Sequence, residues 1–306
     1  MFVTLFSFRH PTRTPRLARM LGWLWLATTP AMASADGGLA TLDWTLAETL
    51  VALDHPPDAV AQVGDYHNWV GEPRLPTNVA DIGLRSQPNV ELLAQLDPAH
   101  ILISPMFGHL APRLEQIGAV DIREIYTPQG DTWSQILSLT RELGMAHGRQ
   151  EEAEALIAAT EARFESLRRA LPEETSPLLV IQFMDERHVR VFGEHGLFQA
   201  VMDRLGLENA WQGETNYWGF SLVGLEALVG LEARLVVVEP YPTGVEEKLA
   251  DSALWQYHPS VREESLITLP PVWSFGALPS AQRFAELLVT ALGEHRRDRS
   301  RLDRQP

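Results

Sequence analysis

A run of 23 residues, Arg149 to Leu171, contains neither glycine nor proline and predicts one long helix, around which the rest of the fold must be arranged. Acidic residues crowd its first turn while Arg168 and Arg169 lie at its end, matching the helix dipole. At 1.5 Å per residue the helix is roughly 34 Å long, enough to run beside two lobes. Its apolar stripe consists of Leu156, Phe164, Leu167 and Leu171. A rigid connection of this kind predicts little domain motion, the alternative being an ordinary helix within one lobe.

Strand and helix patterns alternate on both sides of this run, which predicts an α/β fold of two lobes with mostly parallel central sheets and a ligand cleft between them. In the first half we expect helices at 44–53, 89–96 and 112–117 and strands at 59–63, 101–104 and 122–126. In the second half we expect a hairpin of strands 178–183 and 188–192, strands 235–238 and 266–269, and helices 197–205, 245–254 and 280–292. The predicted divisions are a first lobe at 36–148, the helix at 149–171 and a second lobe at 172–293.

Residues 1–33 have the layout of a secretory signal peptide, with four arginines before a short apolar run and small residues at its end. Cleavage is expected after Ala33 or Ala35. Removing four Arg and no acid changes the formal net charge from -15 to -19 (21 minus 40). This charge argues against nucleic acid as a partner, and no apolar run is long enough for membrane insertion. Without cysteine the chain is not a lipoprotein, so we expect a free periplasmic monomer. The basic tail, 294–306, is predicted to be disordered.

Enzymatic and metal-binding patterns do not emerge from the sequence. It has no nucleophile elbow, phosphate-binding loop or dinucleotide fingerprint, and its histidines form no ligand pair with metal-site spacing. We therefore predict no catalytic residues, no protein metal ligands and no cofactor.

Aromatic residues near turns are the best candidates for a binding site. The segment Asn209–Gly219 holds Trp211 and Trp218 among glycine and polar turn residues, where aromatic rings are typical of a pocket wall. Trp69 and Trp273 also lie in segments read as loops, whereas Trp133 and Trp255 have helical patterns and are expected in the core. Arg85 lies in a predicted loop, from which it could donate to an oxygen-rich ligand or pair with Asp81 or Glu91 at the surface.

Four segments, 83–93, 188–193, 209–219 and 271–276, resemble the FhuD family of periplasmic ferric hydroxamate siderophore-binding proteins, and the likeness runs from about Thr41 to Leu292. The resemblance implies two α/β lobes joined by a long helix, and delivery of ferric siderophore to an inner-membrane ABC importer permease. Iron is then bound only as a siderophore complex. It also implies that Arg85 donates to the hydroxamate oxygens, while Trp44, Trp69, Trp218 and Trp273 form the wall, with Met184 adding to it. Trp211 is expected to be support beneath the cleft.

The chain departs from this family at several pocket positions. Phe107 and Phe275 stand where the resemblance implies tyrosines, Phe220 where it implies a serine, and Ile103 where it implies a tryptophan. Plain rings in place of hydroxyls predict a more apolar cleft with fewer hydrogen-bond donors. We therefore expect Phe107, Phe220 and Phe275 either to shift selectivity toward a related ferric siderophore with a different periphery or to weaken binding of the standard trihydroxamates.

Docking to the permease is implied through one acidic residue in each lobe. Glu226 matches in the second lobe; in the first, Pro112 occupies the position and Glu115 lies one turn further on. Two alternatives stay open at this point: binding of another bulky chelate, such as haem, cobalamin or a catecholate, or a periplasmic enzyme that acts on a chelate. One visible arginine favours a near-neutral hydroxamate over an anionic catecholate.

Overall fold

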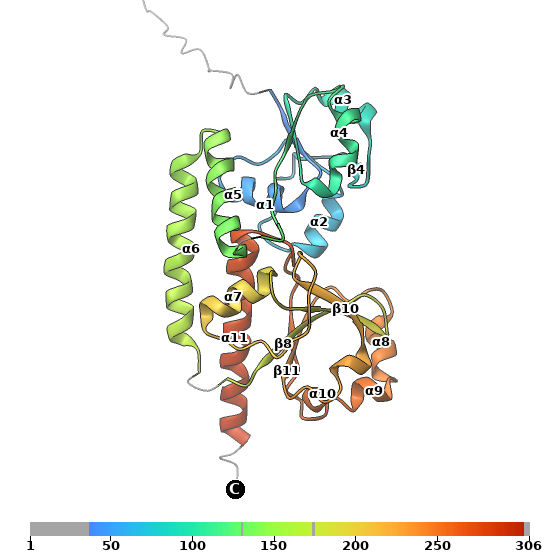
Figure 1. Ribbon diagram of the computed structural model, residues 1–306, viewed down its shortest axis with the longest axis vertical. Coiled ribbons are helices and arrows are strands. Elements are labelled where there is room, and N and C mark those ends of the chain that lie inside the picture. The colour runs from blue at the N-terminus through green and yellow to red at the C-terminus, as the bar shows by residue number, and fades with distance from the viewer. Residues whose placement is uncertain (1–36, 130, 173–174, 303–306) are drawn as a thin grey trace, which may run out of the picture. The chain divides into compact units, whose positions relative to one another are not determined.

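The computed structural model describes residues 37–129, 131–172 and 175–302, with side chains up to Glu294 (Figure 1). The predicted signal peptide lies outside the described residues. The two predicted α/β lobes are present, with three long helices beside them. No helix within the described ranges is long and apolar enough to cross a membrane.

The first lobe contains a five-stranded parallel sheet in the order β3-β2-β1-β6-β7. The strands are β1 (Leu39–Thr41), β2 (Ala59–Val60), β3 (Ala80–Asp81), β6 (His100–Ile103) and β7 (Ala119–Ile122). The helical segments are α1 (Trp44–Ala52), α2 (Val63–Trp69), α3 (Val90–Leu96), a 3-10 turn η1 (Pro105–Leu110) and α4 (Ala111–Leu114). A small hairpin, β4 (Gly83–Leu84) and β5 (Gln87–Pro88), presents Arg85 at its turn.

The second lobe contains a mixed sheet in the order β10-β9-β8-β11-β12. Its strands are β8 (Leu178–Phe183), β9 (His188–Phe192), β10 (Phe220–Gly224), β11 (Arg234–Val238) and β12 (Ile267–Leu269). The predicted β8–β9 hairpin is confirmed, and Asp185 accepts hydrogen bonds from the amides of Arg187 and His188 in its turn. The helical segments are α7 (Leu197–Leu205), η2 (Leu225–Leu228), α8 (Val245–Ala250), α9 (Ala253–Gln256) and α10 (Pro259–Arg262).

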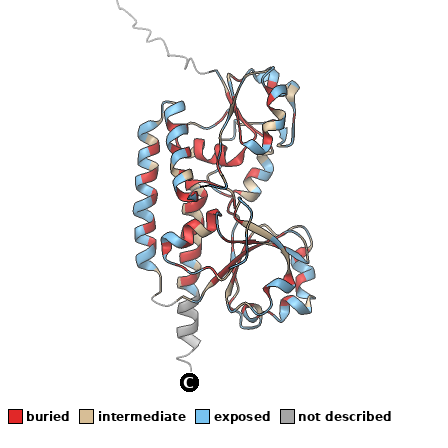
Figure 2. Ribbon diagram, viewed as in Figure 1, coloured by how far each residue is buried: buried red, intermediate tan, exposed pale blue. Residues whose placement is uncertain are grey.

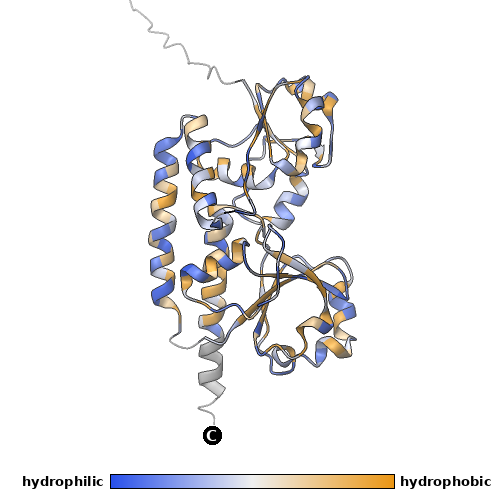
Figure 3. Ribbon diagram, in the orientation of Figure 1, coloured by the Kyte–Doolittle hydropathy of each residue, from blue (hydrophilic) through white to orange (hydrophobic). Residues whose placement is uncertain are grey.

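The predicted long helix is α6 (Gln150–Ala170), which packs against α5 (Thr132–Ala146) and α11 (Leu278–Leu302) at the outer edge of the molecule. Its buried positions recur every three or four residues, while most of the rest is exposed (Figure 2) and hydrophilic (Figure 3). They are Ala153, Ile157, Thr160, Phe164 and Leu167. The predicted long helix is therefore present, but two further long helices, α5 and α11, also run beside the lobes.

One hydrophobic core runs through both lobes and the long helices. It includes Leu46 and Leu50 from α1, Val180 from β8, and Phe284 from α11. Since a wide hinge movement would pull these side chains apart and expose them to water, the packing opposes such a movement.

Several element boundaries differ from those predicted. The sequence reading missed β1, α2, β3 and β10, and it placed β7 at 122–126. It noted a helical pattern around Trp133 but gave the helix α5 no bounds. Trp69 ends the helix α2 instead of lying in a loop. The predicted helix 245–254 breaks into α8 and α9 because Ser252 caps a new helix by accepting from the amide of Trp255. The last helix, α11, continues to Leu302, so the structure contradicts a disordered tail for most of 294–306. Trp133 and Trp255 are buried as predicted.

Candidate ligand-binding cleft

A cavity of about 490 Å³ opens between the two lobes. The segments that follow the carboxyl ends of β1, β6, β8 and β12 all contribute to it, which is where α/β sheets commonly bind ligands. Eight of the nine predicted ligand-binding residues line it together. They are Trp44, Trp69, Arg85, Met184, Trp218, Phe220, Trp273 and Phe275.

Phe107 is the predicted ligand-binding residue that does not line the cavity. The 3-10 turn after β6 leaves Met106 exposed at the cavity and buries Phe107 in the first-lobe core, with 4% of its surface exposed. The Phe107 ring centroid lies 5.0 Å from Cζ of Arg85. Phe107 therefore packs against Arg85 from the first-lobe core and does not line the cavity itself, contrary to its expected place in the site. Ile103 is likewise fully buried in that core.

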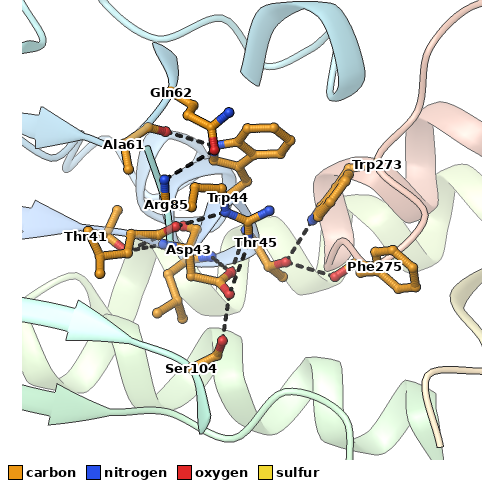
Figure 4. A network of polar contacts seen from close by, with 12 residues as sticks. Thr41, Asp43, Trp44, Thr45, Ala61, Gln62, Arg85, Ser104, Trp273 and Phe275 are labelled. Carbon is orange, nitrogen blue, oxygen red and sulfur yellow. Dashed lines mark hydrogen bonds and ion pairs between the residues drawn. The ribbon is translucent and has the colours of Figure 1, made fainter. Parts of the chain in front are cut away.

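Arg85 is held in the first-lobe side of the cavity by several contacts (Figure 4). Its Nε donates to the carbonyl of Leu42 at 3.0 Å, and its Nη2 lies 3.6 Å from the Asp43 carboxylate. Its Cζ lies over the rings of Trp44 and Trp273, 4.4 and 5.4 Å from the centroids. The surface pairing with Asp81 or Glu91 that was left open therefore does not form. Burial lowers the pKa of Arg85 and Asp43 opposes this change, so the guanidinium stays protonated.

Asp43 is a site residue that the sequence reading missed. It caps α1 by accepting from the amides of Thr45 and Leu46, and it also accepts from the Ser104 hydroxyl at 2.7 Å. Only 5% of its surface is exposed. The signal was available in principle, because an aspartate directly before an apolar helical pattern is typical of an N-cap. Its position beside Arg85 depends on β1 and the β4–β5 turn, which had not been predicted.

The indole rings of Trp44 and Trp273 are fixed by hydrogen bonds from their nitrogens. Trp44 donates to the carbonyl of Ala61 at 2.9 Å, and Trp273 donates to the Thr45 hydroxyl at 3.0 Å. The Thr45 hydroxyl in turn donates to the carbonyl of Phe275 at 2.7 Å. The two indoles meet edge to face with centroids 5.0 Å apart. Since both N–H groups are satisfied within the protein, these rings form a preset apolar surface.

Arg190 is a second cation of the cavity, and the sequence reading did not identify it. It lies on β9 between the buried Val189 and Val191, so strand alternation places it on the opposite face. Its Cζ lies 5.1 Å from the Phe220 ring centroid and 5.4 Å from that of Phe275. Burial lowers its pKa, although an arginine remains charged at neutral pH. The earlier premise of one well-placed arginine was therefore wrong.

The segment 209–219 divides as predicted between wall and support. Trp218 lines the cavity with Tyr217, whose ring centroid lies 3.9 Å away, and Asn216 accepts from the backbone amide of Trp218. Gly219 has a φ of 78°, and a Cβ there would lie 2.0 Å from the Gly196 backbone, so glycine is required at this turn. Trp211 packs against the second-lobe core and does not line the cavity.

Glu226 and Glu115, the predicted docking residues, are both exposed and lie away from the cavity lining. Glu226 belongs to η2 of the second lobe, and Glu115 follows α4 of the first. Each lobe thus offers one of the two carboxylates, while their role stays a prediction. In the described part of the chain, no cluster of three or more His, Asp or Glu side chains could hold a metal ion.

Comparisons with known proteins agree with this geometry. The family model described as "Periplasmic binding protein" matches residues 39–272. The chain is 34% identical over 280 residues to the iron(3+)-hydroxamate-binding protein FhuD of Escherichia coli K12, covering 88% of this chain and 92% of that protein.

Two solved structures show the same fold. The siderophore-binding protein FhuD from Vibrio cholerae, bound to Fe3+-Desferal, is 27% identical with a TM-score of 0.79, covering 84% of this chain and 98% of that one. The triscatecholate siderophore-binding protein FeuA from Bacillus subtilis, complexed with ferri-bacillibactin, is 17% identical with a TM-score of 0.70, covering 86% and 94%. At this identity the second likeness concerns the fold alone.

Proposed function

The chain belongs to the periplasmic binding protein family, and we propose that it captures a ferric hydroxamate siderophore and delivers it to an inner-membrane ABC importer. The observation that carries this proposal is the cavity between the lobes, where rings from both lobes surround a buried guanidinium. The iron(3+)-hydroxamate-binding relative, which matches most of the chain, supports the same ligand class.

The cavity suits the chemistry of a ferric hydroxamate. Three bidentate hydroxamates fill the six coordination positions of ferric iron, so the chelate needs no ligand from the protein. Its surface offers partly charged oxygens as hydrogen-bond acceptors next to aliphatic linkers. Arg85 can donate to those oxygens, and the rings of Trp44, Trp218 and Trp273 can cover the apolar linkers. Iron is thus cargo that arrives already coordinated.

The ion pair between Arg85 and Asp43 supports a hydroxamate over a catecholate. A ferric tris-hydroxamate core is neutral, whereas a ferric tris-catecholate carries three negative charges. The charge of Arg85 is already balanced by Asp43 at 3.6 Å, so this side of the cavity offers donors with little net charge. Such a surface fits a neutral core better than a highly anionic one.

Location and delivery extend the proposal. A periplasmic protein with a removed signal peptide and no lipid anchor would reach an inner-membrane permease by diffusion. Glu226 and Glu115 are exposed on separate lobes, where both can approach arginines of one permease surface. We propose that the protein acts as a monomer and catalyses no reaction of its own.

Tryptophan fluorescence tests the proposal directly, because several indoles surround the cavity. The protein is titrated with ferrichrome, ferric desferrioxamine B, a ferric tris-catecholate, haem and cobalamin. We expect saturable quenching by the ferric hydroxamates and none by the iron-free forms at the same concentration. Quenching by haem or cobalamin alone would reject hydroxamate binding, and turnover of the bound chelate would reject a pure binding role.

A further inference from the structure

Arg190 differs from Arg85 in lacking a counter-charge. Among the described residues it has no ion pair with a carboxylate. Its Nη1 donates to the amide oxygen of Gln182 at 3.4 Å, at the long end of hydrogen-bond distances. A half-buried guanidinium between two phenylalanine rings loses hydration that one long neutral hydrogen bond does not replace.

The rest of the cavity offers Arg190 little compensation. Four charged side chains line it, namely Asp43, Asp65, Arg85 and Arg190. Asp43 pairs with Arg85, and Asp65 is an exposed residue of α2 in the first lobe, where it accepts from Gln62 at 2.7 Å. Arg190 is the charged residue that the second lobe contributes to the lining. The electrostatic field on this side of the cavity is therefore set by an uncompensated cation.

The two arginines come from different lobes and contact different parts of the aromatic lining. Arg85 contacts Trp273, the Trp273 and Phe275 rings meet with centroids 5.2 Å apart, and Phe275 contacts Arg190. A series of contacts through two aromatic rings thus links the guanidinium groups. A chelate whose iron-bound oxygens face Arg85 would present its periphery to Arg190.

We propose that Arg190 is a specificity-determining residue that binds an anionic group on the chelate periphery, so that the preferred cargo is a ferric hydroxamate carrying a free carboxylate. This inference rests on the proposed function and narrows its ligand class. A carboxylate would form the bidentate pair that a guanidinium favours and would balance the charge that the protein leaves open. The plain rings of Phe220 and Phe275 strengthen that pair by excluding water around it.

The test uses three ferric chelates that share one coordinated core and differ at one terminus. Ferric desferrioxamine B ends in an ammonium group, its N-acetyl derivative is neutral, and its N-succinyl derivative ends in a carboxylate. Calorimetric titration of the wild-type protein should rank them succinyl, acetyl, ammonium, with the succinyl form about tenfold tighter than the acetyl form, as expected for a charge-assisted hydrogen bond.

Two variants assign the ranking to Arg190. Arg190→Met keeps the apolar stem but removes the positive charge. The affinities for the three chelates should then lie within about twofold of one another. Arg190→Lys keeps the charge and should preserve the order with a smaller spread. Thermal unfolding of both variants checks that the fold is intact, and the lysine variant keeps the test valid if the methionine variant fails to fold.

The outcomes separate the inference from the function on which it rests. A succinyl preference that persists in Arg190→Met would overturn the role of Arg190, as would an equal loss of affinity for all three chelates. Equal binding of the three by the wild-type protein would overturn it too. Failure of the wild-type protein to bind any of the three would instead reject the proposed function.

Discussion

The two sides of the cavity are built in different ways. On the first-lobe side, Arg85 is paired with Asp43, and the indole of Trp44 is fixed through a hydrogen bond from its nitrogen. Trp273, which follows β12 of the second lobe, packs on this side and donates to Thr45. On the second-lobe side, Arg190 lacks a carboxylate partner and rests on Phe220 and Phe275, and Tyr217 is 40% exposed. We call these the paired wall and the open wall.

The difference suggests that the two walls recognise different parts of the chelate. A preset, charge-balanced wall loses little entropy on binding and suits the feature that all ferric hydroxamates share, the coordinated core. A wall with an uncompensated charge discriminates between peripheries, because each ligand either satisfies or repels that charge. Substitutions in the paired wall should then affect stability and all ligands, whereas those in the open wall should affect the choice between ligands.

The largest expected effect comes from removing the charge of Asp43. Asp43→Asn retains an N-cap side chain for α1 but leaves Arg85 buried without a counter-charge, which should lower the free energy of unfolding by roughly 3 kcal/mol. Urea unfolding measures this loss. Asp65→Asn, at an exposed cavity residue, is the matched control, and Arg190→Met should change stability by less than about 1 kcal/mol. Similar losses in the free energy of unfolding for Asp43→Asn and Arg190→Met would contradict the distinction between the two walls.

Next in size is the loss of ligand binding in Arg85→Met. Removing a charge-assisted donor to the hydroxamate oxygens should cost roughly 1.5 to 3 kcal/mol, or about tenfold or more in the dissociation constant. The loss should be the same for the ammonium, acetyl and succinyl chelates, since all three share the iron-bound oxygens. Calorimetry with this series gives the comparison, and a loss confined to one chelate would contradict the assignment of Arg85 to the core.

A buried carboxyl group behind the paired wall, that of Glu48, should make the free energy of unfolding depend on pH. Glu48 of α1 is fully buried, accepts from the backbone amide of Ala277 at 2.6 Å and contacts the Ser280 hydroxyl, so it ties α1 to the start of α11. Burial raises its pKa from 4.5 to about 8. The folded protein therefore keeps a proton that the unfolded chain releases near pH 4.5.

This contribution to stability is complete below pH 4.5 and is lost as the pH rises toward and through about 8. Between pH 6 and 8 the loss should be roughly 2 kcal/mol. Glu48→Gln retains both hydrogen bonds in a neutral side chain and should remove that slope, with the exposed Glu226→Gln as control. Urea unfolding across this range provides the data, and parallel pH profiles for wild type and Glu48→Gln would exclude a protonated Glu48.

The smallest effect is expected from the ring of Trp218 in the open wall. Trp218→Ala should weaken binding of ferric desferrioxamine B by about 1 kcal/mol, since a stacked aromatic contact contributes roughly this much. Trp211→Phe should leave the affinity unchanged, because Trp211 packs against the second-lobe core. Calorimetry measures the affinity of both variants. An equal loss of affinity in the two would mean that the segment 209–219 affects binding through its fold and not through the Trp218 ring.

The paired wall was easier to predict from the sequence than the open wall. Arg85 and Trp273 lie in two of the four segments that resemble a known family, and Trp44 lies within the wider likeness. The run 149–171 forms the expected helix with shifts of one residue at each end. Arg190 also lies in a resembling segment, 188–193, but the resemblance implied no role for it. Asp43 was missed because its partner reaches it through a turn some 40 positions along the chain, as the separation of Leu42 and Arg85 shows. Pairing across such distances leaves no local signal.

The errors in the open wall and beneath Arg85 have a common physical origin. Whether a side chain faces a cavity depends on the exact register of a short element, and a shift of one residue reverses the answer. In the turn after β6, Met106 is exposed and Phe107 buried, the reverse of the expectation for Phe107. Arg190 could have been found from the alternation in β9, but its contact with Phe275 requires a segment 85 positions away.

A crystal structure of the protein with ferric desferrioxamine B would test most directly the central claim that the cavity between the lobes binds a ferric hydroxamate. The account predicts one chelate between the lobes, with hydroxamate oxygens about 2.7 to 3.1 Å from the Arg85 guanidinium and iron coordinated by the siderophore alone. Its linkers should lie against Trp44, Trp218 and Trp273. A chelate bound outside this cavity, or iron ligated by protein side chains, would contradict the account.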